Sequence, residues 1–139
     1  MTQRPQTTTP EQLLFTYPGS KARLASRLVR FFPEHDIYVS AFGGTGIEFA
    51  HKRPSRREVF NDIDDNIYAV FAVLRDRRLY EQLLRRLEHS HDSRRLYGEC
   101  YDTLQDSTIG LLEQAYCFLI GCNRRRALPR IAQATHING

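Results

Sequence analysis

Residues 36–46 read Asp-Ile-Tyr-Val-Ser-Ala-Phe-Gly-Gly-Thr-Gly, and this stretch decides the fold. Its first part is short and rich in β-branched and aromatic residues, which predicts a buried strand near residues 37–42. The glycines that follow predict a turn, and a short helix is expected from Gly46 to about Lys52. A strand, a turn and a helix in this order favour an α/β fold.

The segments on either side extend this pattern. Ser20 is a candidate N-cap for a helix over residues 20–31, which Pro33 ends. Residues 57–61 predict a second strand, and residues 66–75 predict a second, longer helix. Two consecutive strands joined by a helix run parallel, because the helix carries the chain back to the starting edge. A short parallel sheet is therefore expected.

The rest of the chain is predicted to be helical. Apolar residues recur at helical spacing, and no further strand pattern is convincing. The expected helices cover residues 79–87, 92–104 and 109–121. A length of 139 residues is typical of one domain, so we expect a polar N-terminal arm over residues 1–12 and a single domain over residues 13–139.

Composition bears on where the protein works. The longest mostly apolar stretch, residues 111–122, is too short and too polar to span a bilayer, and residues 1–10 lack the apolar region of a signal peptide. Three cysteines, Cys100, Cys117 and Cys122, are too few and of odd number for a disulfide framework. We therefore expect a cytoplasmic protein with no membrane partner.

The positive charge is concentrated at one end of the chain. Residues 1–60 hold nine Lys and Arg against five Asp and Glu, whereas residues 61–139 hold eleven of each. Eighteen of the twenty basic residues are arginines, which bind phosphates and carboxylates through two parallel hydrogen bonds. Nucleic acid or an acidic partner is expected, and an ordinary solvated surface is the alternative.

The glycine turn and a downstream acid carry the clearest chemical signal. Glycines between a strand and a helix let a ligand approach the backbone and meet the amides of the helix N-terminus. Asp62 follows Gly43 by nineteen residues, at the end of the second predicted strand, where a carboxylate binds ribose hydroxyls. Phe49 occupies the third glycine position of the dinucleotide pattern, so a nucleoside cofactor without a pyrophosphate fits better. A purely structural turn is the alternative.

Three ordered motifs resemble a known family. Residues 17–21 (Tyr-Pro-Gly-Ser-Lys), residues 42–46 (Phe-Gly-Gly-Thr-Gly) and residues 61–64 (Asn-Asp-Ile-Asp) are similar to the N-terminal part of Dam-like DNA adenine methyltransferases. The resemblance covers residues 13–76 well and extends more faintly to Arg126. It implies a partial Rossmann-like methyltransferase core with a helical C-terminal half.

The resemblance also implies a cofactor and the residues that hold it. The cofactor would be S-adenosylmethionine, whose methyl group the family transfers to the exocyclic amine of adenine. Tyr17 and Lys21 would flank it, and Asp62 would hold its ribose. The backbone of the glycine turn would hold its methionine part, through Phe42, Gly43, Gly44 and Gly46. A solvated lysine in the first turn of a helix is the alternative for Lys21.

The chain also departs from the family. Its prolines are all separated in sequence, so the Asp-Pro-Pro-Tyr loop that polarises the target amine and stacks on the flipped base is absent. Ser40 and Ala41 stand where the family has an acid and a proline, and Ser20 stands where it has a second glycine. These departures suggest a truncated and degenerate member that binds S-adenosylmethionine weakly or not at all.

Two further groups of residues bear on possible sites. Arg124, Arg125 and Arg126 form the best candidate contact surface for a partner or for nucleic acid, with a solvated face as the alternative. The spacing of the histidines and cysteines matches no zinc pattern, so no metal is expected.

Three functions follow from these observations. The leading interpretation is a non-catalytic methyltransferase-like protein that binds a protein or nucleoprotein complex, for example as a phage or mobile-element inhibitor of host restriction or CRISPR defence. The second is the cofactor-binding half of a split adenine methyltransferase that another chain completes. The third is a module that binds DNA without sequence specificity through its arginines.

Overall fold

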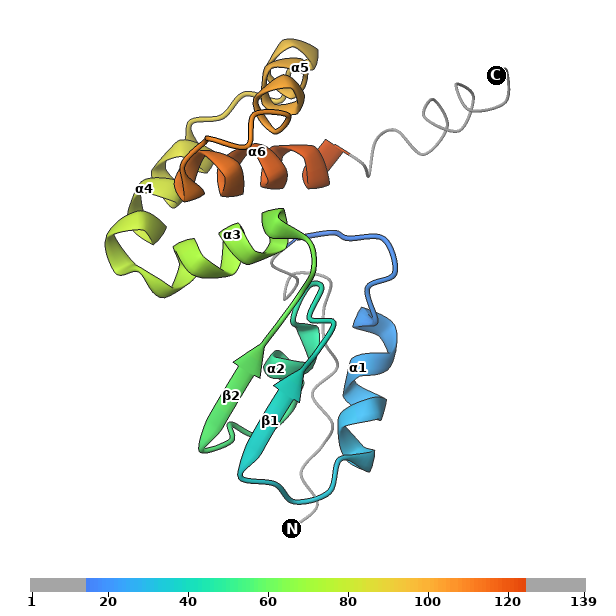
Figure 1. Ribbon diagram of the computed structural model, residues 1–139. Coiled ribbons are helices and arrows are strands. Elements are labelled where there is room, and N and C mark those ends of the chain that lie inside the picture. The colour runs from blue at the N-terminus through green and yellow to red at the C-terminus, as the bar shows by residue number, and fades with distance from the viewer. Residues whose placement is uncertain (1–14, 125–139) are drawn as a thin grey trace. The chain divides into compact units, whose positions relative to one another are not determined.

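The computed structural model describes residues 15–124 (Figure 1). The predicted arm over residues 1–12 therefore lies outside the described residues. The described residues divide between Ile63 and Asp64 into two compact units, which we describe separately. Our expectation of a single domain over residues 13–139 stays a prediction.

The first unit contains the predicted strand, helix, strand order. Strands β1 (Ile37–Ser40) and β2 (Arg57–Phe60) pair in parallel, in a register that sets Ile37 opposite Arg57, and helix α2 (Ile47–His51) lies between them in sequence (Figure 1). Before β1 come helix α1 (Ala22–Leu28) and the 3-10 helix η2 (Val29–Phe31). The parallel pair with a helical crossover is confirmed.

Strand β1 is shorter than predicted. It ends at Ser40, whose carbonyl accepts a hydrogen bond from the Asn61 backbone amide, and the next backbone bond between the two segments runs from the Gly43 amide to the Asn61 carbonyl. Ala41 and Phe42 lie outside the backbone ladder, because the chain is already turning toward the glycines, and the Ala41 carbonyl accepts from the Asn61 side-chain amide at 3.0 Å. The prediction of a strand as far as residue 42 was therefore wrong by two residues.

The sheet is buried on one face only. Tyr38 of β1 stacks on Phe32 at 5.4 Å between ring centroids and meets the edge of Phe49 of α2 at 5.3 Å. Ile37 and Val39 point to the opposite face, because side chains alternate along a strand, and they are 51% and 59% exposed. The prediction of a fully buried strand was wrong for this face.

Lys52, at the end of α2, fixes the loop that leads into β2. Its side chain is only 3% exposed, and its ammonium donates to the Arg53 carbonyl (2.9 Å), to Ser55 Oγ (2.9 Å) and to Glu58 Oε1 (2.5 Å). This hydrogen bond lowers the pKa of Glu58 below its usual value. Since an ammonium has three N–H donors, the buried charge is fully satisfied and the loop is held at three points.

The second unit is helical, as predicted. Its helices are α3 (Asp65–Arg75), α4 (Arg77–Glu88), α5 (Arg94–Thr103) and α6 (Leu111–Arg124). Three of them begin at a capping side chain: Asp64 accepts from the Asn66 amide, Asp76 from the Leu79 amide and Ser93 from the Leu96 amide. Such caps satisfy amides that have no partner within the helix, which explains where these helices start.

The core of this unit lies between α3 and α6. Ile67, Val70 and Val73 of α3 are almost completely buried, and Cys117 of α6 is 2% exposed. Burial raises the pKa of the Cys117 thiol, mainly through loss of solvation of the thiolate. The prediction that Cys117 is a core residue is confirmed.

An ion pair joins α4 to α6. Arg86 binds Glu113 through two hydrogen bonds of 2.5 and 3.1 Å, and its guanidinium lies 3.9 Å from the centroid of the Tyr116 ring. The hydrogen bonds from Arg86 lower the pKa of Glu113. A forked pair of this kind orients two helices as well as attracting them.

The Arg86 pair predicts a pH-dependent contribution to stability. Because the pKa of Glu113 is lower in the folded chain, the contribution is complete above the unfolded pKa of about 4.3 and is lost as the pH falls through the folded pKa. We expect Arg86→Met to lower the free energy of unfolding by about 1 kcal/mol at neutral pH, and by less at pH 3. Urea unfolding at both pH values measures this difference.

Arg95→Met is the matched control, since Arg95 pairs with Glu99 on a solvent-exposed face of α5. That variant should unfold like the wild type at both pH values. A deficit of Arg86→Met that is equally large at pH 3 would show that packing on Tyr116, and not the charge of Glu113, stabilises the contact.

Candidate functional site

The glycine turn at the carboxyl end of β1 has a shape that requires its glycines. Gly44 and Gly46 have φ angles of 51° and 61°, in the left-handed region that side chains disfavour. Gly43 lies against β2, where a Cβ atom would come within 2.1 Å of Phe60 Cε2. All three glycines are therefore explained by the geometry of the turn itself.

The amides of this turn are bonded within the protein. The Gly43 amide donates to the Asn61 carbonyl at 2.8 Å, and the Gly46 amide donates to the Gly43 carbonyl at 2.8 Å. The Gly44 amide donates to Asp62 Oδ2 at 2.7 Å. The turn thus holds its conformation through its own hydrogen bonds, and these three amides already have acceptors.

Asp62 lies beside the glycine turn, as the sequence predicts. Asp62 and Gly44 are eighteen positions apart, and the parallel pairing of β1 with β2 brings the ends of both strands together. In the structure Asp62 fastens the turn to the segment that follows β2. Its predicted role in binding a ribose stays a prediction.

A second carboxylate reaches the site from α2. Ser40 is 7% exposed, and its hydroxyl donates to Glu48 Oε1 at 2.5 Å. Burial, and then the charge of Glu48, raise the pKa of the nearby Tyr38 phenol. Sequence reasoning missed Glu48, although its place in the first turn of the helix after Gly46 was a usable signal.

The Tyr17 to Lys21 segment also lies at the glycine turn. Ser20 Oγ is 3.3 Å from Thr45 Oγ1, a contact between residues twenty-five positions apart. Lys21 precedes α1 and donates from Nζ to the Gly19 carbonyl at 2.9 Å, and the Tyr17 ring meets the Phe15 ring edge-on. The structure therefore brings the three motifs together, while contact of Tyr17 and Lys21 with a cofactor stays a prediction.

Two apolar side chains at the same end of the sheet are almost fully exposed. Phe42 is 90% exposed and Ile63 is 93% exposed, and each follows one of the two strands. Phe42 is one of the predicted site residues, whereas sequence reasoning missed Ile63. Together they present apolar surface beside the glycine turn.

The remaining predicted sites are not placed by the structure. Arg124 ends α6, and its side chain lies outside the described part of the chain together with Arg125 and Arg126. Residues 15–124 contain no cluster of three or more His, Cys, Asp or Glu side chains arranged to hold a metal ion. Within the same residues, no helix has both the length and the apolar character that crossing a bilayer requires.

Comparison with known proteins identifies the family. A search of curated protein sequences gave no significant match. Residues 17–115 match the family described as D12 class N6 adenine-specific DNA methyltransferase, a range that contains all three motifs and continues into α6. The helices and the short parallel sheet are compatible with part of a methyltransferase fold. The chain belongs to the D12 class N6 adenine-specific DNA methyltransferase family.

Proposed function

We propose that this chain acts by binding another macromolecule and that its 139 residues do not by themselves transfer a methyl group. In this proposal the two strands are part of a Rossmann-like core, and the glycine turn serves as scaffold. Use of S-adenosylmethionine is general in the family. Here we expect its binding to be weak or absent.

The observation that carries the proposal is the internal bonding of the glycine turn. The amides of Gly43, Gly44 and Gly46 have acceptors within the protein, and Asp62 provides one of them. The Glu48 carboxylate is likewise bonded within the protein, since it accepts from the Ser40 hydroxyl. Each amide has a single N–H, so a cofactor that bound these amides would have to displace their present acceptors. Losing a hydrogen bond to a charged group costs about 1.5–3 kcal/mol.

The chemistry of the reaction supports the same conclusion. Methyl transfer to an exocyclic amine needs a group that polarises the amine and a flat surface that holds the flipped base. The family's Asp-Pro-Pro-Tyr loop supplies both, and this sequence contains no such tetrapeptide. Binding requires only a complementary surface.

A methyl-transfer assay tests the proposal. We expect the purified chain, with labelled S-adenosylmethionine and adenine-containing DNA, to give incorporation at the level of a protein-free control. Calorimetry should give no dissociation constant in the low micromolar range for S-adenosylmethionine. Label in adenine with this chain alone would contradict the proposal.

One observation favours a second candidate function, a split methyltransferase. Ile37 and Val39 expose an apolar face on a sheet whose described part has two strands, and so small a sheet is rarely stable unless more structure packs on it. Strands from another chain would cover this surface. Adenine methylation that appears only after adding a chain with the Asp-Pro-Pro-Tyr loop would support this candidate, and continued inactivity would exclude it for that partner.

A further inference from the structure

Strand β1 has a free edge. In the described part of the chain the sheet consists of β1 and β2, and β2 pairs with one side of β1. The Ser40 carbonyl points to β2, since it accepts from the Asn61 backbone amide at 2.9 Å. The backbone groups of successive residues in a strand point to alternate sides. Those of Ile37 and Val39 therefore point away from β2.

These outward backbone groups are unpaired. The N–H and C=O groups of Ile37 and Val39 have no hydrogen-bond partner within residues 15–124. A row of unpaired groups along a strand is a template for pairing with a further strand, and proteins usually block such an edge with charged side chains or proline. Residues 37–40 read Ile-Tyr-Val-Ser, so β1 carries neither. Its edge is open to pairing.

The other strand is protected. β2 begins with Arg57 and Glu58, which are both charged and exposed. Glu58 is also engaged by Lys52, whose ammonium holds the loop that leads into this strand. Charged residues of this kind keep a strand from pairing along its edge. β1 is therefore the strand that can accept a neighbour.

The residues of β1 are nearly symmetric about Tyr38. A β-branched residue lies on either side of this tyrosine, and both Ile37 and Val39 expose their side chains on the same face of the sheet. Val59 lies next to Val39 in the register with β2 and extends that apolar face. A second copy of β1 that ran in the opposite direction would present the same pattern. Such a strand would be complementary to itself.

An antiparallel pairing centred on Tyr38 uses every outward group. It sets Ile37 opposite Val39 of the second copy. In antiparallel pairs, residues opposite each other exchange both backbone hydrogen bonds at alternate positions, and here those positions are the outward-facing residues. Tyr38 would meet its equivalent at the two-fold axis. The register also keeps like charges apart, because Asp36 lies opposite Ser40 of the second copy.

Helix α1 and η2 add apolar surface on the same side. Leu24, Leu28 and Phe31 recur at helical spacing and are all exposed. Figure 1 shows α1 and β2 on opposite sides of β1. A second copy that paired along β1 would approach these side chains, so the contact would extend beyond the strands.

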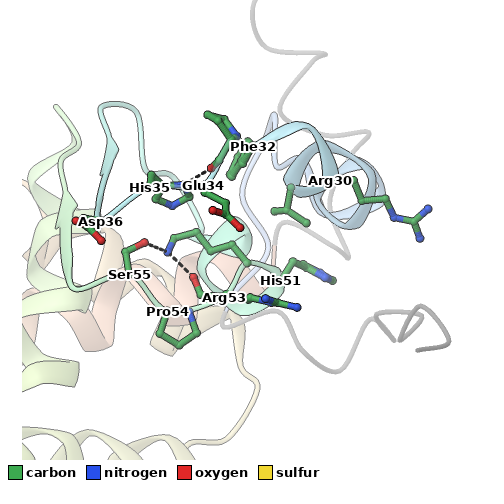
Figure 2. Close-up of a pocket in the computed structure, with 12 residues that line it drawn as sticks. Arg30, Phe32, Glu34, His35, Asp36, His51, Arg53, Pro54 and Ser55 are labelled. Atoms are coloured by element: carbon green, nitrogen blue, oxygen red, sulfur yellow. Dashed lines mark hydrogen bonds between the residues drawn. The ribbon is translucent and has the colours of Figure 1, made fainter. Parts of the chain in front are cut away.

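The edge is held in place before any partner binds. Figure 2 shows Phe32 and His35 next to each other where the chain enters β1, at a hollow of about 920 Å³. The His35 ring lies 5.5 Å from the Tyr38 ring, and His35 Nδ1 donates to the Pro33 carbonyl at 2.6 Å. A preorganised strand has less conformational freedom to lose on pairing.

We propose that this chain forms a symmetric dimer in which β1 pairs antiparallel with β1 of a second copy. The combined sheet contains β1 and β2 of both copies, and its apolar face is long enough to support independent stability. Ile37 and Val39 form apolar cross-strand pairs in it. The near symmetry of β1 selects a second copy over an unrelated strand. The inference goes beyond the proposed function, because a chain can self-associate whether or not it transfers a methyl group.

Analytical ultracentrifugation of the full chain tests the dimer. We expect the wild type to sediment as a dimer at micromolar concentrations. The urea midpoint should rise with protein concentration, because association stabilises the folded state by mass action. A wild type that sediments as a monomer at every concentration would overturn the proposal.

Two double variants test the register. In Ile37→Glu/Val39→Lys, opposite charges of the two copies face one another, whereas in Ile37→Lys/Val39→Lys like charges do. Both variants remove the same apolar side chains. We expect the first to dimerise about tenfold more tightly than the second, because opposite charges directly across two strands attract and like charges repel. Equal affinities would overturn the pairing of Ile37 with Val39 of the second copy.

A proline at the edge tests the backbone bonds. Val39→Pro removes an N–H that points away from β2, so the ladder with β2 is kept. We expect this variant to be monomeric, with the circular dichroism of the wild type. Val39→Thr is the matched control, since it keeps the N–H and the β-branch, and it should dimerise. A dimer of Val39→Pro as tight as that of Val39→Thr would overturn the proposal. The charge variants supply the test if the proline variant does not fold.

The outcomes are distinguishable from failure of the proposed function. Methyl transfer by the purified chain would contradict that function and leave the dimer intact. A chain that is monomeric alone, and that associates only with a protein carrying the Asp-Pro-Pro-Tyr loop, would overturn the dimer and support the split methyltransferase.

Discussion

Replacing Gly43 with alanine is expected to lower the free energy of unfolding by about 1–3 kcal/mol. The new Cβ would lie 2.1 Å from Cε2 and 2.3 Å from Cζ of the Phe60 ring, far inside van der Waals contact. The ring is one of a packed aromatic group and lies 6.1 Å from the ring centroid of Phe49, so it has little freedom to move. Urea unfolding followed by circular dichroism measures the change.

Shortening Phe60 provides the control for this prediction. Leucine lacks the ring atoms that the new Cβ would meet, so Gly43→Ala should cost much less in a Phe60→Leu background. A double-mutant cycle gives the interaction energy between the two positions. If Gly43→Ala costs nothing in the wild type, or costs the same in both backgrounds, the close approach of β2 to the turn is not what selects glycine here.

Asp62→Ala is expected to lower the free energy of unfolding by about 1.5–3 kcal/mol with no cofactor present. The variant removes the charged acceptor of the Gly44 amide and leaves that part-buried N–H without its 2.7 Å partner. Asp62→Asn keeps an oxygen acceptor and removes only the charge, so it should lie between the wild type and the alanine variant. Urea unfolding of the three proteins without S-adenosylmethionine measures the order.

This experiment separates the scaffold role of Asp62 from a role in ligand binding. A scaffold residue affects the free protein, whereas a residue kept only for a ribose affects stability only when ligand is added. Suppose that Asp62→Ala is as stable as the wild type but binds S-adenosylmethionine measurably more weakly. The proposal that the glycine turn serves as scaffold would then be wrong.

The local elements could be predicted because their signals are local. The β-branched run before Gly43 specifies the strand, the glycines that follow specify the turn, and the apolar spacing in residues 66–75 specifies the helix. None of these signals depends on distant residues. The order of these elements requires a parallel pair. The starts of three helices carry the same kind of signal, since Asp64, Asp76 and Ser93 cap residues only two or three positions away. The prediction of Ser20 as the N-cap of the first helix was wrong, because α1 begins at Ala22 after Lys21 and has no side-chain cap.

The sequence by itself therefore determined the element order, the parallel pairing and the meeting of the glycine turn with Asp62. Only the tertiary structure decided how the polar groups are used: Glu48 bonds to Ser40, Lys52 is buried against Glu58, and Asp62 holds the Gly44 amide. The physical reason is that a residue's type limits the hydrogen bonds it can make, whereas the partner it takes depends on distances set by packing across elements.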